Sequence, residues 1–116
     1  MDNINPIEIK NIPSERWEEW CTMFTNGNNG RLVMFQIANK EMEPKTLADD
    51  LGLVAIDYDP VGKGNRITIS FGHREEPNRH IIDGPVKLMQ LQDKNGIVVS
   101  VVIENTDEER SIIILK

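Results

Sequence analysis

The sequence predicts an α+β fold, in which one N-terminal amphipathic helix is followed by six or seven mostly antiparallel strands. Only residues 14–24 repeat apolar side chains with a helical period, whereas most later segments alternate apolar and polar residues or are apolar throughout. Turn-forming Gly, Asn, Asp and Pro separate these segments at short intervals, which favours hairpins. We therefore expect a strongly curved sheet or a small barrel. The 116 residues suit a single domain, 1–116, in which residues 1–12 are expected to be an irregular lead-in.

The predicted helix has the sequence SERWEEWCTMF, residues 14–24. Its apolar residues follow i, i+3, i+4, i+7 spacing and so form one stripe that we expect to pack on the sheet. Ser14 is expected to cap the first free N–H groups, and NGNNG at 26–30 is expected to end the helix, because Gly and Asn tolerate the left-handed conformation. The residues of the stripe are Trp17, Trp20, Cys21 and Phe24.

The middle of the chain changes to a period of two. Residues 31–37 read as a strand, with Val33, Phe35 and Ile37 on one face. Residues 43–52 are interpreted as a short helical turn that begins near a proline and ends at a glycine. Strands at 53–58 and 65–71 flank the turn formers DPVGKG, which predicts a hairpin.

The C-terminal part of the chain is expected to consist of strands alone. RHIID at 79–83 is a short strand, and VKLMQLQ at 86–92 and IVVSVVIE at 97–104 form the clearest hairpin. SIIILK at 111–116 is the last strand. Because residues 97–103 are apolar on both faces, this strand is expected to be central or to have its outer face covered by the helix.

Charge and cysteine content narrow the classes of function. The net charge of −6 disfavours binding to nucleic acid, which draws its affinity from Lys and Arg, and it also disfavours anionic membranes. The longest apolar runs are too short to span a bilayer as a helix, and the N-terminal residues do not resemble a signal peptide. The single cysteine, Cys21, is consistent with a reducing compartment. We therefore expect a cytoplasmic location.

The stretch IDYDPVGKGN, residues 56–65, combines three chemical possibilities. It lacks the first glycine, the Ser or Thr and the following helix of a phosphate-binding P-loop. It also lacks two ligands of an EF-hand calcium loop, at Val61 and Thr68. A strand end followed by a glycine-rich hairpin turn is the favoured interpretation. A ligand or interaction surface formed by Asp57, Tyr58 and Asp59 stays open as the alternative.

The two histidines, His73 and His80, flank the polar segment GHREEPNRH and would complete a metal site only if this loop folded back. A third strong ligand is not evident, so no metal and no cofactor are expected. No catalytic residue is assigned either, since Cys21 lies on the apolar stripe and no nucleophile elbow is present. If the hairpin around residue 62 forms, residues 57–59 and His73 lie at opposite ends of it.

Three stretches together resemble a family. They are RWEEWCTMFTNGNNGRLVMFQI, LADDLGLVAIDYDPVGKGNRITISFG and HIIDGPVKLMQLQDKNGIVVSVVIENTDEERSIIILK, and they cover about residues 14–116. The resemblance is to short bacterial proteins that are catalogued only as a domain of unknown function. It implies that IDYDP belongs to a recurring pattern, and it implies no activity, substrate or site residue.

The expected function is that of a non-enzymatic binding or accessory domain that acts through protein–protein contact. Self-association is its simplest form, because the Ile- and Val-rich C-terminal strands are expected to offer an edge for pairing. The alternative is a binding protein or an enzyme that binds a small ligand or a metal through the region of Asp57, Tyr58 and Asp59, with or without His73 and His80.

Overall fold

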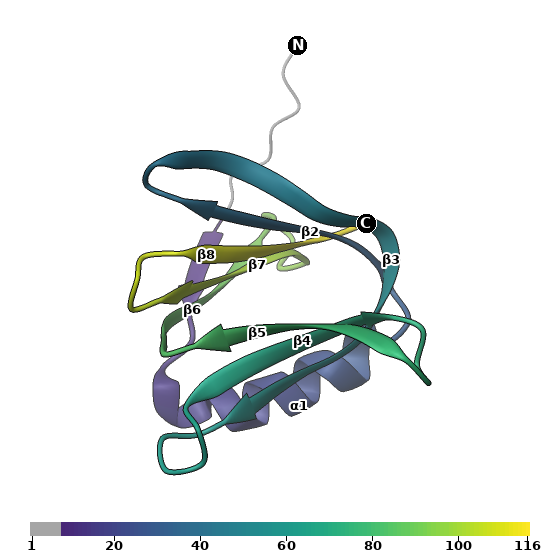
Figure 1. Ribbon diagram of the computed structural model, residues 1–116. Coiled ribbons are helices and arrows are strands. Elements are labelled where there is room, and N and C mark those ends of the chain that lie inside the picture. Colours follow the sequence, from purple (N-terminus) through teal and green to yellow (C-terminus); the bar gives the residue numbers. More distant parts are fainter. Residues whose placement is uncertain (1–7) are drawn as a thin grey trace.

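The computed structural model describes residues 8–116 as one helical segment and an eight-stranded sheet (Figure 1). A 3₁₀ turn, η1 (Ser14–Arg16), leads directly into the helix α1 (Trp17–Asn28). The α+β prediction with one N-terminal helix is therefore confirmed. The strands are β1 (Glu8–Asn11), β2 (Leu32–Asn39), β3 (Met42–Asp59), β4 (Arg66–Gly72), β5 (Pro77–Asp83), β6 (Pro85–Gln92), β7 (Val98–Asn105) and β8 (Arg110–Leu115).

The sheet is entirely antiparallel and open, with the strand order β1-β6-β7-β8-β2-β3-β4-β5. The prediction of six or seven strands is wrong, since residues 8–116 alone form eight. The prediction of a barrel or a strongly curved sheet is also wrong, because β1 and β5 are edges that do not pair with each other and the sheet is not strongly curled. β7 and β8 are interior strands, so they offer no edge for pairing, contrary to the expectation from the sequence.

The long strand β3 connects two halves of the sheet that lie one above the other in Figure 1. Its first part pairs with β2, and from Leu53 onward it pairs with β4. Shortly before this junction, between Ala48 and Leu51, the register with β2 shifts, and Asp50 has a positive φ of 57°. The direction of the sheet therefore changes within one bent strand.

The helical turn predicted for residues 43–52 is wrong, because this segment is the first part of β3. Pro44 and Gly52 are typical of helix boundaries, but pairing with β2 decides the conformation, and that partner is not visible in the local sequence. Pro44 is tolerated because this part of β3 has no strand on its other side.

The lead-in predicted for residues 1–12 is corrected in part. Residues 8–11 form β1, which pairs with β6 in the register Ile9↔Leu91. All four of its residues are exposed, so the strand has no buried face and no alternation that would reveal it. Residues 1–7 lie outside the described part of the chain.

The helix begins later and ends later than predicted. Ser14 lies in η1 and its side chain caps nothing, because the chain enters the helix through a 3₁₀ turn instead of a polar cap. The helix ends at Asn28, and Gly30 follows with a φ of 85°, which agrees with the predicted role of NGNNG. Trp17, Cys21 and Phe24 are buried, so the predicted stripe does face the core.

The core lies between the two halves of the sheet and against α1. The alternation predicted for the strands is confirmed at Val33 and Phe35 in β2 and at Ile67, Ile69 and Phe71 in β4, all of which are buried. The predicted β3–β4 and β6–β7 hairpins are both present, and β7 is central. Within residues 8–116, no helix is long and apolar enough to cross a membrane.

Candidate functional site

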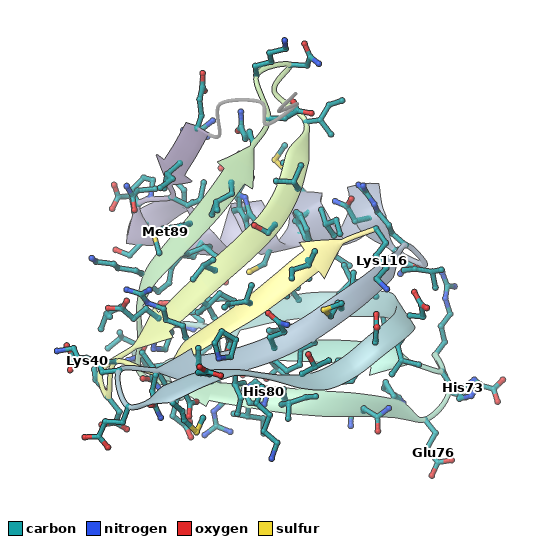
Figure 2. All side chains as sticks on the ribbon, turned by 90° about the horizontal axis from the view of Figure 1, so that it is seen from above. Lys40, His73, Glu76, His80, Met89 and Lys116 are labelled. Atoms are coloured by element: carbon teal, nitrogen blue, oxygen red, sulfur yellow. The ribbon has the colours of Figure 1, made fainter. Side chains whose placement is uncertain are left out.

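The half of the sheet made by β1, β6, β7, β8 and β2 has an outer face, on the side opposite the core. Residues on this side alternate with buried ones: in β8, Ser111 and Ile113 are buried, whereas Ile112 and Ile114 are not. Figure 2 looks onto this face, with Met89 in front and α1 behind the strands. No described element covers it. Its apolar side chains are Ile9, Met34, Met89, Leu91, Val102, Ile112 and Ile114.

These side chains form continuous cross-strand rows. The register places Leu91 opposite Ser100, Ser100 opposite Ile114, and Ile114 opposite Met34. A parallel row runs from Met89 through Val102 to Ile112 and Gln36. The patch is thus contiguous across the strands, a feature that monomeric proteins seldom leave open over a large area.

The outer face ends in a charged row. Lys87 lies opposite Glu104, and Glu104 lies opposite Arg110. The Nε of Arg110 donates a hydrogen bond of 3.1 Å to Glu104, and Lys40 forms a 2.7 Å ion pair with Glu108 at the same end. This end of the outer face therefore carries both signs of charge, paired within the chain.

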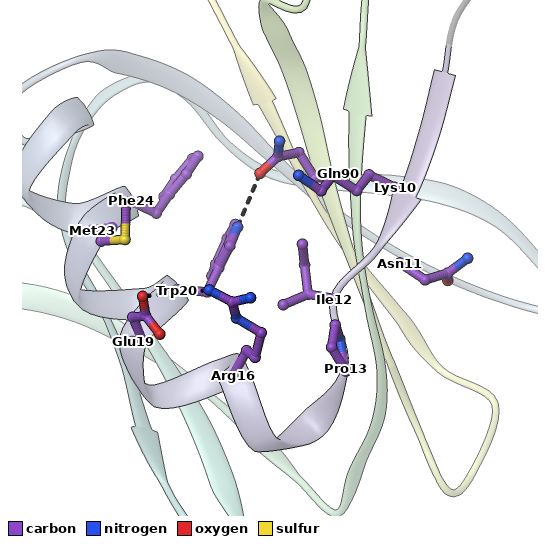
Figure 3. Close-up of a pocket in the computed structure, with 10 residues that line it drawn as sticks. All are labelled: Lys10, Asn11, Ile12, Pro13, Arg16, Glu19, Trp20, Met23, Phe24 and Gln90. Carbon is purple, nitrogen blue, oxygen red and sulfur yellow. Dashed lines mark hydrogen bonds and ion pairs between the residues drawn. The ribbon is translucent and has the colours of Figure 1, made fainter.

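A second surface feature is a groove between the helix and the edge of the sheet (Figure 3), with a volume of about 450 Å³. The indole of Trp20 stacks on the ring of Phe24, with ring centroids 4.7 Å apart and an angle of 13° between the ring planes. The Nε1–H of Trp20 donates a 2.9 Å hydrogen bond to Oε1 of Gln90 on β6. Gln90 in turn donates to Gln92. This chain of hydrogen bonds fixes the indole plane.

The opposite wall of the groove is the segment between β1 and η1. The N–H of Ile12 donates to the carbonyl of Leu88 at 2.9 Å, and the carbonyl of Ile12 accepts a 2.7 Å hydrogen bond from Nε1–H of buried Trp17. Both polar groups of this residue are therefore satisfied, and the wall is anchored to both the sheet and the helix. Lys10 and Arg16 stand at the rim (Figure 3).

The predicted surface of Asp57, Tyr58 and Asp59 divides between two environments. Tyr58 is half-buried and packs edge-on against Trp17, with ring centroids 5.3 Å apart. Its ring therefore takes part in the packing of the helix on β3, and it also borders a small hollow beside the helix. The carboxylates of Asp57 and Asp59 are on exposed residues. Asp57 also borders a small hollow of about 280 Å³ beside the helix, with Glu18 and Thr25.

The two predicted histidines lie in different environments and do not meet (Figure 2). His73 is exposed in the loop after β4. His80 is half-buried on β5, where its ring lies 4.9 Å from the ring of Phe35 and its Nε2 lies 3.4 Å from the hydroxyl of Ser111. Burial lowers the pKa of His80 below its usual 6.5, and nearby Glu109 partly offsets this.

The hairpin register separates the predicted residues as the sequence suggested. Asp59 pairs with Arg66 at one end of β3–β4, whereas Leu53 pairs with Phe71 near the end that leads to His73. In the described residues, no three His, Cys, Asp or Glu side chains come close enough to hold a metal ion. Burial and the charge of Asp57 raise the pKa of the Cys21 thiol to about 12.

Comparison with protein families shows that residues 8–116 match the family described as a family of unknown function, DUF5335. The chain belongs to DUF5335. The resemblance to a domain of unknown function is therefore confirmed, and it extends over all the residues that the structure describes. No curated protein and no solved structure matches the chain.

The groove and the outer face of this DUF5335 chain were both missed in the sequence interpretation. The apolar outer side of β7 was visible in IVVSVVI, but it was attributed to a central strand or to cover by the helix. The strand is central, yet α1 packs against β3 on the other side of the sheet. The groove joins Trp20 to Gln90, which are 70 residues apart, and no local pattern signals that contact.

Proposed function

We propose that this DUF5335 protein is a binding domain that acts through protein–protein contact, and that it associates with a second copy of itself. The outer face carries the proposal, since seven apolar side chains lie on one uncovered side of five neighbouring strands. Ile9 is exposed and the other six side chains are half-buried, and a contiguous apolar patch on an uncovered face is typical of interaction sites. A two-fold dimer brings the same patch of both subunits together. The outer face carries both signs of charge at one end, so two copies of it can meet with opposite charges facing each other.

The dimensions of the face suit a dimer. Three strands of ~26 Å, β8 of ~20 Å and β1 of ~13 Å, spaced ~4.8 Å apart, give a planar area of roughly 530 Å², and the accessible surface of side chains exceeds the planar area. A standard stable interface takes about 800 Å² from each partner. Sheet-to-sheet packing at about 10 Å would let the Ile, Met, Leu and Val side chains of the two copies interdigitate.

The decisive experiment measures mass in solution by light scattering after size exclusion, at protein concentrations from about 1 to 100 µM. The monomer mass is 13.2 kDa, so a dimer has twice this mass. Ile112→Lys places a charge in the middle of the outer face and is expected to yield a monomer. Ile81→Lys is the matched control, because Ile81 is an exposed isoleucine on β5, in the other half of the sheet.

The expected pattern is a dimer for the native chain and for Ile81→Lys, and a folded monomer for Ile112→Lys. Circular dichroism of each variant checks that the fold is retained. A native chain that stays monomeric at 100 µM refutes self-association. Dimers of equal strength in all three proteins would show that association uses a surface other than the outer face.

A further inference from the structure

We propose that the groove between α1, η1 and β6 is a binding site for a small amphipathic anion that has an aromatic body and a carboxylate. This inference is independent of the proposed dimer, because the groove opens on the helix side of β1 and β6 while the outer face lies on the other side. Lys10 and Gln90 pair with each other in the β1–β6 ladder and both line the groove. Ile9 and Leu91, the adjacent pair, belong to the outer face.

The groove has the size and composition of a ligand site. Its volume of about 450 Å³ falls within the range of roughly 300–1,000 Å³ found for sites that bind small molecules. Trp20 and Phe24 provide a stacked aromatic wall, and Ile12 and Pro13 provide the apolar wall opposite (Figure 3). An aromatic ring is the body that best matches this lining, since it stacks in an offset or edge-on manner on the indole.

The lining is already in its binding arrangement. Trp20 is held by its hydrogen bond to Gln90, and Ile12 is held on both sides by Leu88 and Trp17. A ligand therefore does not have to order these side chains, which lowers the entropic cost of binding. The indole N–H is satisfied within the protein, so the groove recognises its ligand through the ring face and the rim.

The charge of the rim selects an anion. The chain as a whole has a net charge of −6, yet the groove is lined by two cationic side chains, Lys10 and Arg16, and by one acidic side chain, Glu19. Arg16 and Glu19 form an ion pair of 3.6 Å, and both side chains are more than half exposed. Such an exposed ion pair contributes little to stability, so the guanidinium of Arg16 can turn to a ligand carboxylate. The two oxygens of the carboxylate match the paired N–H donors of the guanidinium.

The test uses naphthoate as the anionic aromatic probe, and naphthamide as its neutral counterpart of nearly the same shape. Acetate is the anion without a ring. Binding is followed by NMR through the two indole N–H resonances, one from Trp20 in the groove and one from buried Trp17. Naphthoate is expected to shift the Trp20 resonance more than the Trp17 resonance, with a dissociation constant on the order of 1 mM or tighter.

Arg16→Gln is expected to weaken naphthoate binding about tenfold while leaving naphthamide binding unchanged. Arg79→Gln is the matched control, because Arg79 is an exposed arginine on β5, in the other half of the sheet, and this change should leave both affinities as they are. Acetate should cause no saturable shift. Absence of a naphthoate shift at Trp20 overturns the site. Equal affinity for naphthoate and naphthamide, or an unchanged affinity in Arg16→Gln, overturns the selection of an anion.

Discussion

Replacing Phe35 by alanine should destabilise the protein strongly, because this ring lies between the two halves of the sheet. Phe35 on β2 is 1% exposed, and its ring lies 5.5 Å from the ring of Phe71 on β4 and 4.9 Å from that of His80 on β5. Removing the ring gives up roughly 150 Å² of buried apolar surface, which at about 25 cal/mol per Å² corresponds to about 4 kcal/mol. Measured Phe→Ala changes in cores cost about 3–5 kcal/mol, in agreement with this value.

A domain of this length has a free energy of unfolding of roughly 6–17 kcal/mol, so Phe35→Ala should still fold. We expect its urea midpoint to fall by about 2 M and its Tm by roughly 12–20 °C, as measured by circular dichroism. Leu32→Ala on the same strand is the control, since Leu32 is 48% exposed and should lose less than about 1 kcal/mol. If Phe35→Ala lost no more than Leu32→Ala, the ring would not connect the two halves as the structure indicates.

Three further predictions concern single groups. His80 has a lowered pKa in the folded protein, so the unfolded chain binds more protons in this pH range. The contribution of neutral His80 to the free energy of unfolding should therefore be complete above about pH 6.5 and be lost as the pH falls toward the folded pKa. Urea titrations between about pH 5 and 7 should show this slope in the native protein and in His73→Gln, but not in His80→Gln; a slope that persists in His80→Gln would assign it to another group. Cys21 is 2% exposed and its pKa is raised to about 12, so Ellman's reagent should react at pH 8 more than about 100-fold slower with the folded protein than in urea, and rapid labelling of the folded protein would contradict this burial. Asn105→Ala should cost about 1–2 kcal/mol in urea unfolding, because the side-chain oxygen accepts the N–H groups of the β7–β8 turn at 3.0 and 2.9 Å, and a loss below about 0.5 kcal/mol would show that water replaces it.

Elements with a strong local pattern were predictable from the sequence. The helical stripe that contains Trp17 and Cys21 and the period-two alternation around Val33 and Ile67 each appear within a few residues, and the structure confirms all four as buried. The hairpins were predictable for the same reason, since their turn residues and both strands are adjacent in the chain.

The elements that failed depend on distant partners. Residues 43–52 form a strand because β2 lies beside them, and residues 8–11 form one because β6 lies about 80 positions further along the chain. The candidate surfaces have the same origin. Gln90 reaches Trp20 only when α1 packs beside β6, and the outer face becomes continuous only when β8 lies between β7 and β2.

The bent strand β3 makes the two halves of the sheet one cooperative unit. Because one continuous strand pairs with β2 through its first part and with β4 from Leu53 onward, unfolding of β3 removes a hydrogen-bonding partner from both halves. Amide hydrogens of β4 and of β8 should therefore exchange through the same global unfolding event, although these strands are separated in the sheet by β2 and β3. A ligand in the groove or a partner on the outer face would then protect amides throughout the sheet, well beyond the residues that it touches.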